Sequence, residues 1–372
     1  MRLKLVIGVI LAVWLILLGR LYYLSVVSNE QYANIAKENT TKTKDIAPTR
    51  GQILDTNGVP LAINLLGYSI SLAPHLDDDE LESELLYINS VFKEQNITIL
   101  SKEYDRYNSA YNQDFIKVVD FLEYDRVVPY FAKLNLRQNL SVEPAALRHY
   151  PYDSLASHVI GYVGRANSRD IEENPLSKLV DMTGRSGIEA FYNEILQGKK
   201  GQRQTRVTAL NQTVEEVFYT KPTSLDISLH IDIKLQAFLR ELYDGKTGAV
   251  IVMDIKNGAI IGAGSFPEYS LNQFVTGISA KEWDELINDF DHPFTNKLVN
   301  GLYPPGSVIK MGVSLGFLNS TKISKDTKVF CNGYLEYGKN NHKFRCWKSW
   351  GHGNINMNDA IRESCDVYFY EN

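Results

Sequence analysis

The sequence has few cysteines and no excess of positive charge. The formal net charge of −5 gives no reason to expect nucleic acid as a partner. The three cysteines are an odd number, so at least one stays unpaired if a disulfide forms. No internal repeat or low-complexity tract stands out. With 44% hydrophobic residues in 372 positions, the chain can form two domains with sizeable cores and carry a membrane anchor as well.

One apolar run is long enough to matter for membrane topology. Residues 5–18 are continuously apolar, and residues 21–27 continue the run after Gly19 and Arg20. Together they give about 23 residues, which matches a single bilayer span. A cleaved signal peptide is the alternative, but no A-x-A cleavage site follows the run. Because Arg2 and Lys4 precede the span, we expect a cytoplasmic N-terminus with the rest of the chain outside.

Ser307 and Lys310 form the most informative short motif of the chain. They follow Pro304, Pro305 and Gly306, a sequence that suits the opening of a helix. In a helix, positions three apart lie on one face, so the hydroxyl and the amine are expected side by side. A neutral lysine in that place can take the serine proton and make the oxygen a nucleophile. Alone, the S-x-x-K pattern also occurs by chance in ordinary capped helices.

A second motif, Ser364 with Asp366, strengthens this interpretation. Serine acyl-transfer enzymes of the penicillin-recognising class combine S-x-x-K with S-x-N or S-x-D and then a K-T-G strand. The second serine passes protons between the lysine and the leaving group. No K-T-G follows Asp366 in this sequence. The letters do occur at residues 246–248, but these precede Ser307, and we interpret them as coincidence.

Three further stretches resemble the class B penicillin-binding proteins in family order. Residues 47–62 (A-P-T-R-G-Q-I-L-D-T-N-G-V-P-L-A) resemble the signature that this family carries just outside the membrane. Residues 184–189 (G-R-S-G-I-E), followed by L-Q-G at 196–198, match a second family segment. Residues 248–258 resemble the hairpin that opens the transpeptidase domain. Asp366 and the G-H-G at 351–353 indicate the elongation branch, the penicillin-binding protein 2 type.

The resemblance implies a peptidoglycan D,D-transpeptidase of the bacterial cytoplasmic membrane, with its bulk in the periplasm. Ser307 would attack the D-alanyl-D-alanine carbonyl of a stem peptide, and Lys310 would deprotonate it. Ser364, oriented by Asp366, would relay the proton to the departing D-alanine. Beta-lactams would acylate the same serine. The family also implies a polytopic glycan-polymerising membrane protein as partner, and no organic cofactor.

Two other functions remain open at this point. Because the K-T-G strand is missing, the chain is also interpretable as a catalytically dead fragment, or as a scaffold that keeps only its anchor and pedestal. A penicillin sensor or a serine beta-lactamase is the third interpretation. The long pedestal with its Arg50-Gly51 signature argues against a penicillin sensor and against a beta-lactamase.

The cysteines cluster near one histidine in the sequence. Cys331, Cys346, His352 and Cys365 together could form a tetrahedral Cys3His zinc site, and His342 is an alternative ligand. By spacing alone, a Cys331–Cys346 disulfide or inert buried thiols stay equally open. The family resemblance favours zinc, because some elongation-type members hold zinc in this segment. Such a site would fix the loop between the two catalytic motifs.

We therefore predict an α/β chain in three parts. Residues 1–28 form the cytoplasmic tip and transmembrane helix, and residues 29–222 an α+β pedestal resembling a dimerisation domain. Residues 223–372 form the incomplete N-terminal part of a transpeptidase domain, with an antiparallel sheet and a helical subdomain.

Periodicity predicts several individual elements. Trp347 and Trp350, near His352, have two interpretations: they line the cleft or, as we favour, they pack in a core. We also expect the apolar back face of the helix that carries Ser307 to pack in a core. The expected elements are strands at 68–72 and 224–231, helices at 77–92, 118–134 and 233–242, strand-and-turn segments at 148–152 and 158–164, and a hairpin of 250–253 with 259–263.

Overall fold

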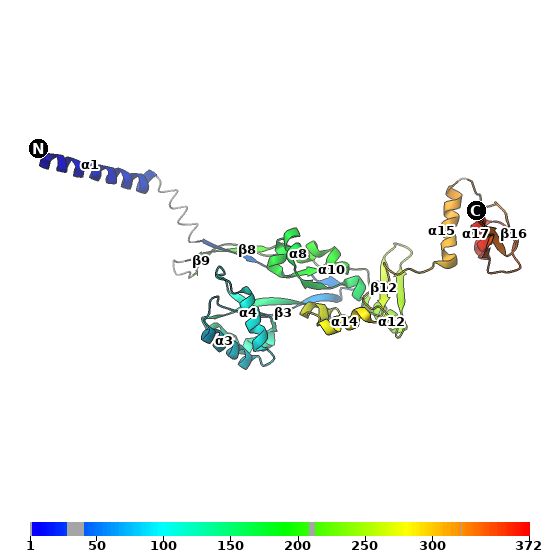
Figure 1. Cartoon of the computed structure of the whole chain (residues 1–372), viewed down its shortest axis with the longest axis horizontal. Coiled ribbons are helices and arrows are strands. Elements are labelled where there is room, and N and C mark those ends of the chain that lie inside the picture. The colour runs from blue at the N-terminus through cyan, green and yellow to red at the C-terminus, as the bar shows by residue number, and fades with distance from the viewer. Residues whose placement is uncertain (1, 28–40, 208–212, 321) are drawn as a thin grey trace. The chain divides into compact units, whose positions relative to one another are not determined.

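The computed structural model describes residues 2–27, 41–207, 213–320 and 322–372. The chain forms two compact units, Met1–Asn300 and Gly301–Asn372 (Figure 1). Residues 29–40, the predicted beginning of the pedestal, lie outside the described part. The predicted boundary at 28 borders these undescribed residues and stays a prediction. The predicted boundary at 222 also stays a prediction.

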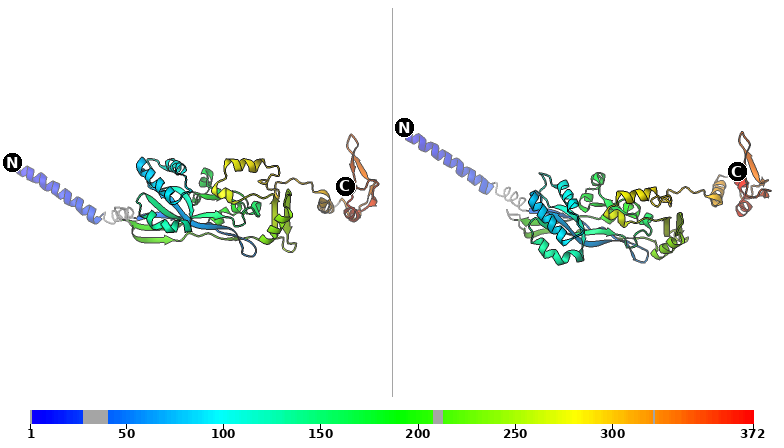
Figure 2. Two further views of the ribbon diagram at one scale, coloured as in Figure 1. Left: turned by 90° about the horizontal axis from the view of Figure 1, so that it is seen from below. Right: turned by 60° about the horizontal axis from the view of Figure 1, so that its bottom comes forward.

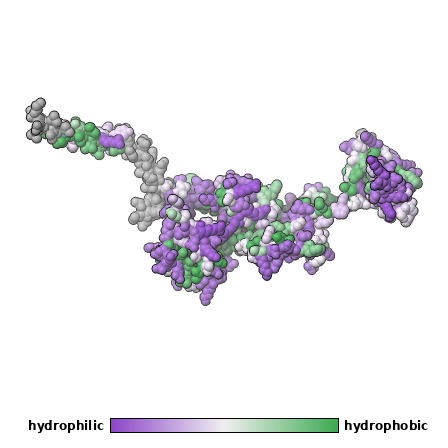
Figure 3. Space-filling model, in the orientation of Figure 1, coloured by the Kyte–Doolittle hydropathy of each residue, from purple (hydrophilic) through white to green (hydrophobic). Residues whose placement is uncertain are grey.

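The N-terminal apolar run is helical. It forms α1 (Arg2–Tyr22) and continues as a π-helical turn, η1 (Tyr23–Val27). Its described side chains are exposed, and Figure 3 shows a largely apolar surface along this helix. Within the described residues, however, no helix has both the length and the apolar character that a membrane crossing needs. The predicted anchor is thus not confirmed.

A long strand, β3 (Pro60–Leu72), organises the larger unit. It pairs antiparallel with β4 (Ile116–Glu123) along one edge and with β5 (Leu140–His149) along the other. The sheet is extended by β2 (Ile53–Leu54), which pairs with β3 and runs parallel to β10 (Ile227–Ser228). The strand predicted at 68–72 is therefore the end of β3, and the one predicted at 224–231 is much shorter than expected.

Two helices cover the sheet beside β3 and β4 (Figure 2), and their apolar faces form the first core with it. These are α3 (Asp78–Val91), as predicted, and α4 (Ile97–Tyr107). Asp77 caps α3 by accepting from the Glu80 N–H, while the Glu80 side chain accepts from the Asp77 N–H. The acidic residues here stabilise the helix start, as a capping box does.

The helix predicted at 118–134 is wrong. Residues 118–123 belong to β4, and only short helical turns follow: α5 (Tyr124–Val127), η2 (Val128–Tyr130) and α6 (Phe131–Asn135). Val118 and Val119 are β-branched and buried against β3, which favours a strand. Pro129 then prevents the turns from joining into one long helix.

The rest of the pedestal contains a ribbon and a small α/β region. The ribbon consists of β1 (Thr41–Ile46), β8 (Gly201–Val207) and β9 (Thr213–Thr220), all antiparallel. The segment 158–164, predicted as strand and turn, begins in a short helix and ends in a strand. The small region contains α7 (Ser157–Ile160), β6 (Val163–Arg165), α8 (Ser168–Glu173), α9 (Leu176–Val180), β7 (Met182–Gly184), α10 (Gly187–Phe191) and α11 (Asn193–Gln197).

The end of the first unit follows the predicted pattern closely. Helix α12 (Ile233–Leu242) begins after Asp232, whose carboxylate accepts from the N–H groups of Lys234 and Leu235. The hairpin of β11 (Gly248–Met253) and β12 (Ile260–Phe266) is confirmed. Helices α13 (Asn272–Thr276) and α14 (Ala280–Asn288) come next.

The second unit is small and is built around the cysteines. It contains η3 (Gly306–Val308), α15 (Ile309–Asn319), the strand pairs β13 (Val329–Cys331) with β16 (Gly353–Ile355) and β14 (Tyr334–Tyr337) with β15 (His342–Arg345), α16 (Met357–Arg362) and α17 (Asp366–Glu371). All three cysteines belong to its core. The prediction that the apolar face of α15 packs in the core is wrong in part, because Met311 and Leu315 are exposed.

Candidate active site and metal cluster

Ser307 and Lys310 lie together at the beginning of α15. Ser307 occupies the 3-10 turn η3, which follows Pro304 and Pro305, and Gly306 before it has a positive φ of 56°. The three-residue spacing places the lysine Nζ 3.3 Å from the serine Oγ. The predicted pairing of hydroxyl and amine is present in the structure.

The Lys310 amine contacts every other member of the predicted catalytic set. Its Nζ lies 3.1 Å from Ser364 Oγ, 3.0 Å from the Ser364 carbonyl oxygen and 2.5 Å from Asp366 Oδ1. The residue is only 8% exposed, and its Nζ lies 5.7 Å from the ring centroid of Phe369. A buried amine with several acceptors is held in one place, which is what a proton-transferring group needs.

Ser364 completes the cluster from the turn between α16 and α17. Its Oγ lies 2.6 Å from Ser307 Oγ. Its φ of 52° is left-handed, a conformation that is uncommon and costly for a residue other than glycine. Two hydrogen bonds hold the turn, from Ser364 N–H to the Ile361 carbonyl and from Cys365 N–H to the Ala360 carbonyl. The turn points the second hydroxyl at the first.

The arrangement can move a proton in both directions. A hydroxyl nucleophile, an amine and a second hydroxyl are mutually within hydrogen-bonding distance, and a carboxylate binds the amine. Such a set can deprotonate Ser307 and deliver a proton to a leaving group beside Ser364. The structure thus brings all four predicted catalytic residues together.

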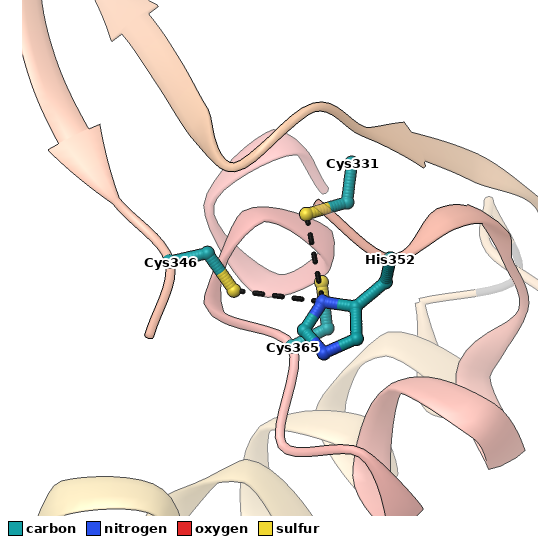
Figure 4. A group of neighbouring side chains, drawn as sticks. All are labelled: Cys331, Cys346, His352 and Cys365. Carbon is teal, nitrogen blue, oxygen red and sulfur yellow. Dashed lines mark hydrogen bonds between the residues drawn. The ribbon is translucent and has the colours of Figure 1, made fainter. Parts of the chain in front are cut away.

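The four predicted metal ligands also come together (Figure 4). The ligand atoms of Cys331, Cys346, His352 and Cys365 all lie within 4.8 Å of one another. The Sγ atoms of Cys331 and Cys346 are each 3.6 Å from His352 Nδ1. The residues come from β13, the segment after β15, the segment before β16 and the turn before α17. Three thiols and one ring nitrogen form the donor set of a Cys3His zinc site.

The protonation of the cluster is tuned by its surroundings. Burial raises the pKa of the Cys365 thiol to about 12. Burial also acts to raise the pKa of Cys346, but backbone N–H groups of Lys348, Asp366 and Val367 hold it below its usual value. Burial, and then the charge of Lys348, lowers the pKa of His352, which favours the neutral ring that a metal ligand needs.

Two alternatives to a zinc site with these four ligands were a disulfide and the use of His342 as a ligand. The structure holds all three cysteines as free thiols and so contains no Cys331–Cys346 disulfide. His342, the alternative ligand, is exposed on β15, stacks edge-on against Phe344 and is not part of the cluster. His352 Nε2 is buried and has no hydrogen-bond partner among the described residues.

Trp347 lies at the site, although the sequence led us to favour a core position over one lining the cleft. We expected it in a core, with Trp350, but the two residues are 63% and 79% exposed. Its indole N–H donates to the Glu363 carbonyl at 2.9 Å, and its backbone N–H donates to Asp366 Oδ2 at 3.3 Å. The signals in the sequence are its position next to Cys346 and near His352, both metal-ligand candidates.

The K-T-G letters at 246–248 have local structural contacts. Lys246 Nζ donates to the Leu242 carbonyl at the end of α12, and Thr247 Oγ1 donates to Asp291 Oδ1. These contacts account for both side chains without a catalytic role.

A buried ionic hub lies in the first unit, where two of the recognised stretches meet. The Glu189 carboxylate, which is fully buried, accepts from Arg50 Nε at 2.7 Å and from Arg148 Nε at 2.7 Å. The Tyr150 hydroxyl donates to it at 3.2 Å. Arg50 and Glu189 come from different stretches of the sequence, and Arg148 was not predicted to join them.

Comparison with known proteins agrees with these observations. Residues 45–224 match the penicillin-binding protein dimerisation domain, and residues 248–372 match the penicillin-binding protein transpeptidase domain. The chain is 33% identical to peptidoglycan D,D-transpeptidase MrdA of Escherichia coli, over 96% of this chain and 57% of that protein. The Haemophilus influenzae protein of the same name is 31% identical, over 96% and 56%.

Solved structures give the same result. The complex between penicillin-binding protein 2 and MreC from Helicobacter pylori contains a chain that matches with a TM-score of 0.80 and 42% identity. The match covers 89% of this chain and 62% of that one. The chain therefore spans less than two thirds of the length of each of these relatives.

Proposed function

The chain belongs to the class B penicillin-binding proteins of the elongation type, and we propose that it works as a peptidoglycan D,D-transpeptidase. The observation that carries this proposal is the cluster of Ser307, Lys310, Ser364 and Asp366. A hydroxyl 2.6 Å from a second hydroxyl, with a shared buried amine, is arranged for acyl transfer.

The reaction proceeds in two balanced halves. Ser307 Oγ gives its proton to Lys310 and bonds to the carbonyl carbon of the penultimate D-alanine. The amide bond to the terminal D-alanine then breaks, and the departing amine takes a proton through Ser364. In the second half, a neighbouring stem amine attacks the ester and Ser307 regains its proton. A beta-lactam acylates Ser307 in the same way, but its leaving group stays attached.

Labelling with a fluorescent penicillin tests this function. The wild-type protein is expected to give a covalent band that Ser307→Ala abolishes. Ser320→Ala is the matched control, because Ser320 ends the same helix and its Oγ donates only to the Phe317 carbonyl. Absence of the wild-type band would favour a non-catalytic scaffold function. Rapid hydrolysis of nitrocefin would favour a beta-lactamase.

We also propose that Cys331, Cys346, His352 and Cys365 hold a structural zinc ion. Three thiol sulfurs face His352 Nδ1, and backbone N–H groups surround the Cys346 sulfur, both of which suit a thiolate–zinc site. The ion would crosslink β13, β16 and the turn that carries Ser364. Metal analysis of the purified protein tests this, with one zinc per chain expected. Only a trace of zinc, together with a disulfide, would contradict it.

We propose the outer face of the bacterial cytoplasmic membrane as the place of action. The apolar run at 5–18 and the preceding Arg2 and Lys4 support this. Stem peptides are the proposed substrate. An MreC-type protein is a proposed partner, since the Helicobacter pylori neighbour is in a complex with MreC, and a polytopic glycan polymerase is a second. Alkaline carbonate extraction of membranes tests the location: release into the soluble fraction would contradict an anchor.

A further inference from the structure

We infer that Trp347 is a positioning residue, which holds Ser364 and Asp366 in place for acyl transfer. This inference rests on the transpeptidase function proposed above. The hydrogen bonds of Trp347 go to Glu363 and Asp366, and not to Ser307 or Lys310. It acts through the turn between α16 and α17.

Two hydrogen bonds from Trp347 bracket Ser364. The indole Nε1–H donates to the carbonyl of Glu363, one residue before the serine. The backbone N–H donates to the carboxylate of Asp366, two residues after it. One residue therefore holds both ends of a four-residue turn whose second member has a left-handed φ of 52°. Such a conformation persists only where surrounding contacts enforce it.

The contact with Asp366 also fixes the rotation of its carboxylate. Oδ1 accepts from Lys310 Nζ, while Oδ2 accepts from the Trp347 N–H. With one oxygen held by the protein backbone, the other is directed at the amine. The position of Lys310 between two serine hydroxyls thus depends on Trp347 as well as on Asp366.

Burial alone does not explain why a tryptophan stands here. The residue is 63% exposed, so most of its ring gains nothing from packing. Its ring meets the His352 ring edge-on, with centroids 5.6 Å apart, and its indole N–H is satisfied by the turn. The ring thus keeps the donor in place, and phenylalanine would keep the ring contact but lose the donor.

The test compares Trp347→Phe with Trp350→Phe in the whole chain as purified. Trp350 is the matched control, since it lies in the same loop and its ring contacts the Lys348 ammonium. Acylation by a fluorescent penicillin is measured over a range of concentrations, which separates the affinity from the limiting acylation rate. Loss of one neutral hydrogen bond predicts a rate about three- to tenfold lower for Trp347→Phe, with affinity unchanged. Trp350→Phe should match the wild type.

Amide hydrogen exchange gives a second readout that needs no activity. Trp347→Phe is expected to accelerate exchange at Ser364 and Cys365, whose N–H groups close the turn, and to leave α15 unchanged. A weaker affinity with an unchanged rate would overturn the inference and make Trp347 a substrate contact. Equal acceleration throughout the unit would also overturn it, in favour of a general packing role. If the wild type is not acylated at all, the transpeptidase proposal fails, and exchange at the turn still decides what Trp347 holds.

Discussion

Lys310 Nζ and Asp366 Oδ1 lie 2.5 Å apart, and this pair ties the start of α15 to the start of α17. The two serine hydroxyls lie beside the pair, so its geometry sets theirs. Both side chains are largely buried, at 10% and 23% exposed. Removing Asp366 takes away both the negative charge and the acceptor oxygen that hold the Lys310 amine in place.

Substitution of Asp366 should therefore separate charge from shape. Asp366→Asn keeps an oxygen that can accept from Lys310, whereas Asp366→Ala removes it. We expect the limiting acylation rate to fall in the order wild type, Asn, Ala, with Lys310→Met slowest, at about 100-fold or more below wild type. Stopped-flow acylation with a fluorescent penicillin measures this. Asp326→Ala, in the same unit, is the control. An alanine variant as fast as wild type would exclude a role for the carboxylate.

Metal removal should weaken the second unit selectively. Zinc would link all three cysteines of its core, so a chelator is expected to lower the unfolding temperature of the protein and to slow acylation. Differential scanning fluorimetry with and without the chelator measures the shift. Cys365→Ser should mimic the chelator, while His342→Ala, outside the cluster, should not. An unfolding temperature that the chelator leaves unchanged would count against a structural metal.

The same site should bind its metal more tightly as the pH rises. The thiol of Cys365, whose pKa burial raises to about 12, must lose its proton to become a ligand. At any pH below that value metal and proton compete, so metal affinity increases with pH. Competition with a colorimetric zinc chelator, from about one pH unit below neutral to about one above it, measures this dependence. A flat profile would show that Cys365 is not a ligand.

The cluster of Ser307, Lys310, Ser364 and Asp366 could be predicted because each pair belongs to a short, recognisable motif. The spacing of Ser307 and Lys310 fixes their distance within one helical turn. The cluster of three cysteines and His352 could be predicted because cysteine is rare in this chain. The sequence offered Trp347 as a residue lining the cleft but did not predict its contacts, because no local pattern reveals its two hydrogen bonds to the turn.

The fold was predictable where one periodicity dominates. Helices α3 and α12 have clear caps and an apolar face, and the hairpin of β11 and β12 has a turn at Asn257-Gly258. The prediction of a helix at 118–134 failed because a strand with buried β-branched residues leads directly into short helical turns. Neither the strand period nor the helix period therefore continues for long enough to be recognised. The ionic cluster around Glu189 could not be predicted completely, because Arg148 lies outside the two recognised stretches that supply Arg50 and Glu189.

That hub should be a major source of stability in the first unit. The buried Glu189 compensates two buried arginines, Arg50 and Arg148. Glu189→Ala leaves both without their carboxylate, which should cost about 3–5 kcal/mol in the free energy of unfolding. Urea denaturation measures this change. Glu194→Ala, at a nearby exposed position on α11, should change stability little. An equal loss of stability in both variants would show that the ion pairs of Glu189 do not stabilise the first unit specifically.

Glu268 should make the stability of the first unit depend on pH. Its side chain is 3% exposed, and burial raises its pKa from 4.5 to about 7. Between these two values the folded protein keeps a proton that the unfolded chain releases. Stability therefore falls as the pH rises from 4.5 to about 7, by about 3 kcal/mol at most.

A nearby histidine complicates the measurement, and the variant Glu268→Gln resolves it. Burial lowers the pKa of His158 from 6.5 to about 4, so His158 makes the fold less stable as the pH falls through that range. The two slopes oppose each other in the wild type. The glutamine keeps an oxygen that can accept from the Ala156 N–H but has no proton to lose. The difference between the two unfolding curves therefore isolates Glu268, and it should grow from pH 4.5 to 7 and then stay constant. A difference that does not change with pH would mean that Glu268 titrates normally in the fold.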